Sequence, residues 1–409
     1  MNKYDVIVIG GGAAGLMAAG KAAEIVEKVL LLEKMNQPGR KLRITGKGRC
    51  NLTNVAPMRE FLEHIGDNSR FVRHAFSVFF SQDLIDFFES KGVPVTVERG
   101  QRAFPTSESA QDIFYALVKW VEKNRVFVKR EAAVSRLLIE NNEIKGVVAN
   151  NISYFADKVI LATGGASYPA TGSTGDGYRL ARNAGHHITE ICPALVPFET
   201  KGRIAQQLQG LSLKNVKASI WINGKKKYEE FGEMMFTHFG VTGPIVLTLS
   251  RKIARELKNK ESIVCSIDLK PALDDTKLDN RLVRDLDEHG KMKFGSVTRK
   301  WLPGKLSQIS CDLLKISPHK LCNQISAEER KRIRLWLKDF RLEISGSRDF
   351  AEAIITSGGI DLKEVDSKTM QSKLIKGLYF AGEVLDLDAD TGGYNLQIAF
   401  STAWLAAIS

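Results

Sequence analysis

The stretch of sequence that decides the fold is residues 4–33, YDVIVIGGGAAGLMAAGKAAEIVEKVLLLE. Residues 4–9 and 29–33 are apolar, β-rich runs, and residues 13–27 between them are helical in pattern. A glycine-rich turn separates the first run from the helix. Because the crossover between parallel strands is right-handed, the stretch predicts one βαβ unit with two parallel strands.

The glycine-rich turn contains the pattern GxGxxG, formed by Gly10, Gly12 and Gly15. Gly10 permits the tight turn, Gly12 lets the backbone approach a pyrophosphate, and Gly15 lets the helix pack closely on the strand. The helix start offers N–H groups and a positive dipole to the phosphates. Glu33 ends the second run, where a carboxylate can accept hydrogen bonds from ribose hydroxyls. Together these features predict dinucleotide binding.

The rest of the chain predicts a doubly wound α/β domain interrupted by an insertion. Residues 157–162 and 378–381 are buried strands of that domain. Near Pro193 the pattern changes, with a hairpin turning at Asn223-Gly224 and amphipathic helices over 274–320. The expected segments are 1–193 and 346–409 for the first domain, 194–272 and 326–345 for an inserted β domain, and 273–325 for a helical insert.

Local signals add further helices. Residues 59–64 and 73–91 have helical patterns. Ser109 with Asp112, and Ser326 with Glu329, have the spacing of capping boxes, which start helices running to about residues 124 and 339. The helix after the last strand is expected to begin near Asn395.

Three segments favour FAD over NAD as the dinucleotide. Residues 39–54, GRKLRITGKGRCNLTN, follow the acidic strand end and can wrap a pyrophosphate and reach a flavin ring. Residues 161–165, LATGG, end a strand where ligands bind in open α/β sheets. Residues 381–383, AGE, and 391–397, TGGYNLQ, suit a ribityl contact and a helix start aimed at the flavin N1/C2=O edge.

At these motifs the chain resembles the BaiN/RdsA-type NAD(P)/FAD-dependent oxidoreductases, also called YhiN-like flavoproteins. The matching stretches are GGGAAGLMAA, GRKLRITGKGRCNLTN, ATGGASYPATGSTGDGY, FTHFGVTGP, TSGGI and AGEVLDLDADTGGYNLQIA. They cover residues 7–400. The resemblance implies an FAD domain of the glutathione-reductase type with an inserted barrel-like β domain and a small helical domain. Thr45 stands where the family commonly has Ser, and Ala389 where Gly is usual.

Motifs and resemblance together define the expected cofactor-binding residues. They are Gly10, Gly12, Ala13, Ala14, Gly15, Glu33, Lys34, Arg40, Lys41, Thr45, Gly46, Arg49, Cys50, Asn51, Val134, Ala162, Thr163, Gly164, Gly165, Gly382, Glu383, Gly393, Tyr394, Asn395, Leu396 and Gln397.

The sequence assigns no catalytic residue, but three side chains are candidates. His238, in a loop before a helix that Pro244 opens, can protonate a substrate after hydride transfer or be a structural loop histidine. Cys50 can act as a thiolate if Arg49 lowers its pKa, or can be a small packing residue. Tyr394 can hydrogen-bond substrate or flavin.

Composition narrows the classes of function. The five cysteines are dispersed and form no CxxC pair, which argues against a disulfide framework, a redox disulfide and a zinc site. With no apolar run near ~18 residues and no secretory leader pattern, we expect a cytoplasmic protein without a membrane span. The net charge of +12 has no single long run, so we interpret it as a dispersed surface charge and do not favour nucleic acid as a partner.

Three functions follow, in order of preference. The first is hydride transfer between NAD(P)H, as a transient reductant, and a small organic substrate through FAD. The second is an FAD-dependent oxidase of a small amine using O2. The third is an RNA-associated flavoprotein. The sequence does not fix the substrate or the oligomeric state.

Overall fold

The computed structural model describes residues 3–259 and 261–409, and the chain divides into two compact units. Unit 1 holds residues 1–194 and 350–409, and unit 2 holds residues 195–349. Both ends of the chain therefore belong to unit 1, and unit 2 is an insertion in it. Within the described residues, no helix combines the length and the apolar character that a membrane crossing needs.

Unit 1 is built on a five-stranded parallel sheet with the order β19-β10-β1-β2-β6. β1, β2 and β10 are apolar and buried almost throughout, as expected for inner strands of a parallel sheet covered on both faces. The strands are β1 (Val6–Ile9), β2 (Val29–Leu32), β6 (Phe127–Lys129), β10 (Lys158–Leu161) and β19 (Leu378–Phe380).

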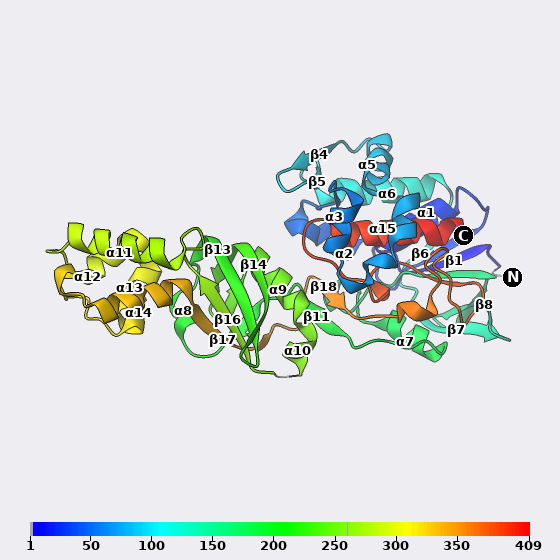
Figure 1. Ribbon diagram of the computed structural model, residues 1–409. Helices are drawn as coiled ribbons and strands as arrows, with labels where there is room; N and C mark the ends of the chain where they lie inside the picture. Colours follow the sequence, from blue (N-terminus) through cyan, green and yellow to red (C-terminus); the bar gives the residue numbers. More distant parts are fainter. Residues whose placement is uncertain (1–2, 260) are drawn as a thin grey trace. The chain divides into compact units, whose positions relative to one another are not determined.

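Two layers cover this sheet (Figure 1). The helices α1 (Ala13–Ala22), α6 (Ala110–Lys123) and α15 (Tyr394–Ile408) lie on one face, where α1 packs against both of the others. The antiparallel strands β7 (Val134–Glu140), β8 (Glu143–Ala149) and β9 (Ile152–Phe155) lie on the other. The βαβ prediction is confirmed, because β1 and β2 pair in parallel with α1 between them.

Shorter elements complete unit 1. They are α2 (Arg40–Ile44), the 3-10 turn Thr45–Gly48, α3 (Met58–Glu63), α4 (Arg73–Val78), α5 (Ser81–Ser90), α7 (Asp176–Asn183), and the strands β3 (Thr53–Asn54), β4 (Val95–Glu98), β5 (Arg102–Pro105), β11 (Cys192–Ala194) and β18 (Ile355–Ser357). β11 pairs with β18, so the chain leaves and re-enters unit 1 on adjacent strands.

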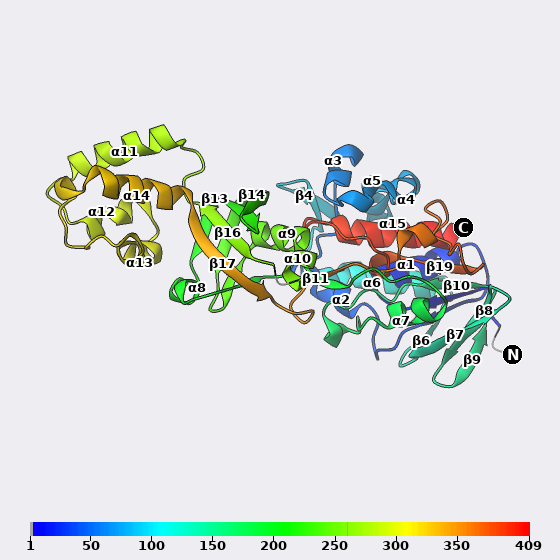
Figure 2. The same cartoon turned by 60° about the horizontal axis from the view of Figure 1, so that its bottom comes forward.

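Unit 2 contains a closed six-stranded barrel, and its helices are inserted in the chain between the barrel strands (Figure 2). The barrel strands are β12 (Phe198–Thr200), β13 (Ser212–Ile222), β14 (Lys225–Phe236), β15 (Gly240–Thr242), β16 (Ile263–Asp268) and β17 (Phe340–Ser347). Its helices are α8 (Ile204–Gln207), α9 (Pro244–Lys252), α10 (Ala254–Lys258), α11 (Asp275–Glu288), α12 (Phe294–Trp301), α13 (Gly304–Leu314) and α14 (Ala327–Lys338). The fold class inferred from the sequence, a Rossmann domain with an inserted barrel and helical part, is confirmed.

Several local predictions are confirmed and others are wrong. The turn at Asn223-Gly224 joins β13 to β14, and Ser326 with Glu329 forms the predicted capping box. The expected helix 73–91 is instead two helices, because Phe79 has an extended backbone. Ser109 caps α6 through the N–H of Gln111, without a reciprocal bond from Asp112. The first helix ends five residues earlier than expected, at Ala22.

Candidate cofactor site

Three glycines of the first turn have different surroundings, which separates packing from ligand binding. A Cβ on Gly10 would lie 2.6 Å from the Ala162 carbonyl oxygen, and one on Gly15 would lie 1.7 Å from the Gly10 carbonyl oxygen. Both glycines are therefore required by the protein's own packing. A Cβ on Gly12 would meet no atom within 4 Å. The space in front of Gly12 is open, as a binding cradle at the start of α1 requires.

Glu33 is buried directly behind this turn. Its two carboxylate oxygens accept hydrogen bonds from the backbone N–H groups of Gly11 and Met35, each at 2.7 Å. The side chain therefore holds the glycine turn in place. A carboxylate can accept further bonds on its remaining lone pairs. The ribose contact expected from the sequence stays a prediction.

Lys41 links the loop after β2 to the C-terminal part of the chain. Its ammonium donates to the Glu383 carboxylate at 2.8 and 3.2 Å and to the Ser167 hydroxyl at 2.6 Å. Glu383 also accepts from the Ser167 hydroxyl at 3.0 Å and the Thr356 N–H at 2.8 Å. Four segments far apart in sequence are thus joined by one polar cluster beside the ends of β10 and β19. Lys41 is thus paired with a carboxylate, and its expected contact with the cofactor stays a prediction.

Three buried polar atoms in or near these loops have no hydrogen-bond partner among the described residues. They are Nε of Arg49, Oδ1 of Asn51 and Oγ1 of Thr163. A buried polar atom without a hydrogen bond costs stability, so such atoms often mark a ligand site. Asn51 lies in the GRCNLTN motif and Thr163 follows β10. Both positions were expected to contact FAD, and a polar cofactor edge would give each atom a partner.

The C-terminal motif lies against the two N-terminal motifs. A Cβ on Gly382 would lie 2.8 Å from the Cβ of Ala14 in α1, and a Cβ on Gly393 would lie 2.4 Å from the Thr53 backbone. The Asn54 side chain also donates to the Gly392 carbonyl at 3.3 Å. The start of α15, one residue earlier than expected, is therefore held against the 39–54 loop. Its first N–H groups lack intrahelical partners, as in any helix.

Three side chains of the TGGYNLQ motif contact other residues of the protein. Gln397 is fully buried and bonds Thr53, Ser401 and the Phe79 carbonyl. Asn395 bonds the backbone of Ala389 and Asp390. The Tyr394 ring stacks on His64, with centroids 4.4 Å apart, and burial raises the pKa of its hydroxyl to about 12. A role for Asn395 and Gln397 toward a cofactor would therefore fall to their backbone. The expected contacts of Tyr394 and of the half-buried Leu396 stay predictions.

Arg49 and Cys50 do not form the activated thiolate considered above. The Arg49 guanidinium pairs with Glu98 and Glu108 and lies over the Phe104 ring. Cys50 is fully buried, and desolvation raises the pKa of its thiol to about 12. A thiol with this pKa is protonated at neutral pH. Cys50 is therefore a packing residue, which was the second possibility derived from the sequence.

The other expected residues are placed as follows, and their cofactor contacts stay predictions. Ala13 and Ala14 begin α1, Ala162, Gly164 and Gly165 follow β10, Val134 begins β7, and Arg40, Thr45 and Gly46 lie in and after α2. Lys34 pairs with Asp176 of α7 at 2.5 Å, which ties its ammonium to a carboxylate. His238 lies in unit 2, where its ring contacts Phe239.

Sequence reasoning missed two members of the polar cluster, Ser167 and Thr356. Both residues lie in stretches that the sequence analysis had already identified. Ser167 is part of ATGGASYPATG, and Thr356 is the first residue of TSGGI. The Ser167 hydroxyl and the Thr356 backbone N–H both donate to Glu383, and the Thr356 hydroxyl accepts from the Ser167 N–H, because β18 and the loop after β10 lie side by side. No local pattern signals that contact.

The fold and the gathered loops define a Rossmann-type flavoprotein. The family model described as "HI0933-like protein Rossmann domain" matches residues 4–409. The chain belongs to this family and is an FAD-dependent oxidoreductase.

Two relatives match along their whole length. The chain is 30% identical over 411 residues to "Ribosomal RNA dihydrouridine synthase" of Escherichia coli, covering 100% of this chain and 98% of the relative. It is 31% identical over 410 residues to "3-dehydro-bile acid delta(4,6)-reductase" of Clostridium scindens, covering 99% and 98%. Among solved structures, a 3-ketosteroid delta1-dehydrogenase from Sterolibacterium denitrificans aligns over 100% of this chain and 99% of its own, with 13% identity and a TM-score of 0.50. That likeness concerns the fold alone.

Proposed function

We propose that this protein reduces a carbon–carbon double bond conjugated to a carbonyl group, using NAD(P)H as reductant and FAD as carrier. The observation that carries the proposal is the meeting of four loop segments at the C-terminal edge of β1, β10 and β19. The open space in front of Gly12 supports the same site, as do the buried atoms of Asn51 and Thr163 that lack a hydrogen-bond partner. Ligands of open α/β sheets bind at this edge.

We assign each of these segments a role in binding FAD. The turn at Gly12 and the start of α1 would bind the pyrophosphate, and Glu33 the ribose. Glu383, held by Lys41, would orient the ribityl chain, and the start of α15 would stabilise negative charge on the reduced ring. When bound, FAD supplies the two-electron carrier, and the protein supplies position and electrostatics.

The names of the relatives point to one shared chemistry. A delta(4,6)-reductase saturates carbon–carbon bonds, and forming dihydrouridine saturates the uracil C5=C6 bond. In both substrates the double bond is conjugated to a carbonyl group, which lets the β-carbon accept hydride. Delivery of a proton to the α-carbon then completes the reduction.

NAD(P)H is proposed to dock transiently. The sequence contains one GxGxxG unit, which FAD would occupy, and no second one. A shared docking place for NAD(P)H and substrate predicts ping-pong kinetics. In anaerobic stopped flow, NADH or NADPH should bleach the flavin of the holoenzyme, and an enone should restore its colour. Bleaching by amines instead, with H2O2 formed in air, would support the oxidase and overturn the reductase.

Cofactor placement is tested separately with Gly12→Ala. Because the new Cβ meets no protein atom, folding should be unchanged, while FAD affinity should fall about tenfold or more by contact with the pyrophosphate. Gly304→Ala is the matched control, since its Cβ also meets nothing and it lies in α13 of unit 2. Equal FAD affinity in both variants would contradict the placement.

The distribution of charge favours a second candidate, an RNA base as the substrate. Residues 195–349 contain 30 Lys and Arg against 19 Asp and Glu, whereas the rest contains 29 against 28. Unit 2 therefore carries +11 of the total of +12, although no single long run of basic residues concentrates it. A basic unit attached to a catalytic one suits a polyanionic substrate.

The two substrates can be told apart directly. Holoenzyme with NADPH is given either ribosomal RNA lacking dihydrouridine or a small enone, and the products are analysed for a gain of two hydrogens. RNA binding should weaken steeply with salt. Lys331→Glu with Arg332→Glu, on the exposed face of α14, should weaken it, while Lys123→Glu with Arg125→Glu in unit 1 should not. RNA left unmodified while the enone is reduced would exclude this candidate.

A further inference from the structure

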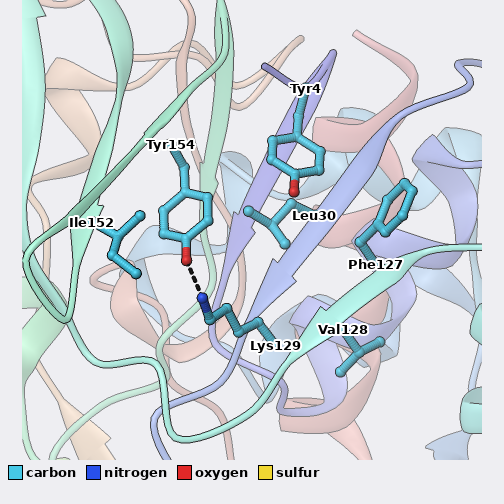
Figure 3. A pocket seen from close by; sticks show the side chains of 7 residues that line it. All are labelled: Tyr4, Leu30, Phe127, Val128, Lys129, Ile152 and Tyr154. Atoms are coloured by element: carbon cyan, nitrogen blue, oxygen red, sulfur yellow. Dashed lines mark hydrogen bonds between the residues drawn. The ribbon is translucent and has the colours of Figure 1, made fainter. Parts of the chain in front are cut away.

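A second concavity lies in unit 1, formed by the sheet edge and strand β9 (Figure 3). Its volume is about 350 Å³, within the range of small-molecule pockets. The lining residues are Tyr4, Leu30, Phe127, Val128, Lys129, Ile152 and Tyr154. None of them belongs to the expected cofactor set, and the pocket has no role in the function proposed above.

The walls of this concavity are aromatic and partly exposed. The Tyr4 ring meets Phe127 edge-on, with centroids 5.8 Å apart, and meets Tyr154 at 6.4 Å. Phe127 is 54% exposed and Ile152 42% exposed, so a ligand that covers them removes apolar surface from water. Flat aromatic ligands gain additional energy by packing against such rings.

A positively charged side chain, Lys129, also lines the concavity. The Lys129 ammonium donates a hydrogen bond to the Tyr154 hydroxyl and lies 5.0 Å from the centroid of that ring. Figure 3 shows this bond crossing between β6 and β9. Within residues 3–259 and 261–409, no carboxylate forms an ion pair with Lys129. An ammonium has three N–H donors, and Tyr154 uses one.

We propose that this concavity is a binding site for a planar aromatic carboxylate. The rings of Tyr4 and Phe127 pack on the aromatic part, and the ammonium of Lys129 donates to the carboxylate. A charge-assisted hydrogen bond of this kind is about twice as strong as a neutral one. Aromatic walls alone would accept any apolar molecule, so the unpaired cation is what selects an anion.

Isothermal titration of the holoenzyme with 2-naphthoate tests the site. A ligand of this size should bind with a dissociation constant on the order of 1 mM. The neutral 2-naphthamide and the non-aromatic cyclohexanecarboxylate should each bind at least about tenfold more weakly, because one lacks the charge and the other the flat ring.

Two variants locate the binding. Lys129→Met and Phe127→Ala should each weaken 2-naphthoate about tenfold, whereas Lys123→Met, an exposed lysine of α6, should leave it unchanged. Phe127 is exposed, so its truncation keeps the fold intact and provides a result even if Lys129→Met disturbs β6. Absence of binding, equal binding of the amide, or binding unaffected by both variants would overturn the proposal. Flavin reduction by NAD(P)H is measured independently of these outcomes.

Discussion

The ammonium of Lys41 lies 2.8 Å from the carboxylate of Glu383, although the two residues are 342 positions apart in the chain. Both side chains are mostly buried, with about a quarter and a fifth of their surfaces exposed. This pair closes the N-terminal loop 39–54 onto the segment that returns from unit 2.

We expect Lys41→Met and Glu383→Gln each to lower the free energy of unfolding by about 1–3 kcal/mol, because each leaves a partly buried polar partner unpaired. The double variant should lose less unfolding free energy than the two single variants lose together. Urea unfolding of the apoprotein measures this coupling between Lys41 and Glu383. Lys201→Met is the control, since its pair with Glu343 is more than 60% exposed on both sides and should contribute less than about 1 kcal/mol. Strict additivity would show that the two residues act separately.

Gly393→Ala should destabilise the protein by about 2–3 kcal/mol. Gly393 has a φ of +99°, and a Cβ there would lie 2.4 Å from the Thr53 backbone, which cannot move aside easily. Gly304→Ala should be neutral or slightly stabilising, because Gly304 has open space and lies in a helix. Thermal melts of the two variants against the parent measure the difference. Equal melting temperatures would mean that the α15 start does not depend on this contact.

All five cysteines should resist thiol reagents in the folded protein. Each is buried and none is in a disulfide, and burial raises the thiol pKa of Cys50 and Cys265 to about 12. Titration with a chromogenic disulfide at pH 8 should therefore detect no fast-reacting thiol in the native state and five in guanidinium. A rapidly modified Cys50 in the native state would restore the thiolate role that burial excludes.

His186 should make stability depend on pH. It is buried between Glu364 and Ser372, at 3.0 and 2.8 Å, and burial lowers the pKa of its ring. The unfolded chain therefore takes up a proton near pH 6.5 that the folded chain takes up only at lower pH. Stability is complete above about pH 7 and falls as the pH decreases below 6.5.

The matched variants for this pH effect are neighbours. His186→Gln should be less stable than the parent at pH 7.5 and should lose less additional stability between pH 7 and pH 5. His187→Gln should behave like the parent, because the His187 side chain is 65% exposed. Melting temperatures across this pH range give the comparison. An unchanged slope in His186→Gln would assign the acid sensitivity to another group.

Much of the fold could be predicted because its signals are local. Gly15 is required by its contact with Gly10 within one βαβ unit, and the capping box of Ser326 spans three residues. The alternation around Asn223-Gly224 likewise needs only its own hairpin. Predictions failed where tertiary packing overrides the local sequence pattern. The helical pattern of residues 73–91 is broken into α4 and α5 at Phe79, whose ring stacks on Trp404 of α15.

The candidate site could be predicted only in outline. The motifs identified loops that the structure brings together, but Gln397 and Asn395 bond to the protein, and Arg49 pairs with Glu98 instead of activating Cys50. A sequence motif does not determine the direction in which each of its side chains points. That direction depends on neighbours contributed by distant segments, such as Thr53 beside Gln397.

The sequence by itself determined the Rossmann unit, the insertion and the family, because glycine turns, strand periodicity and helix caps act over a few residues. Only the tertiary structure decided that Lys41 pairs with Glu383, that Cys50 is inert, and that Lys129 has no carboxylate partner among the residues that the structure describes. The physical reason is that charge pairing and desolvation depend on which surfaces meet, and that is set by the packing of segments far apart in the chain.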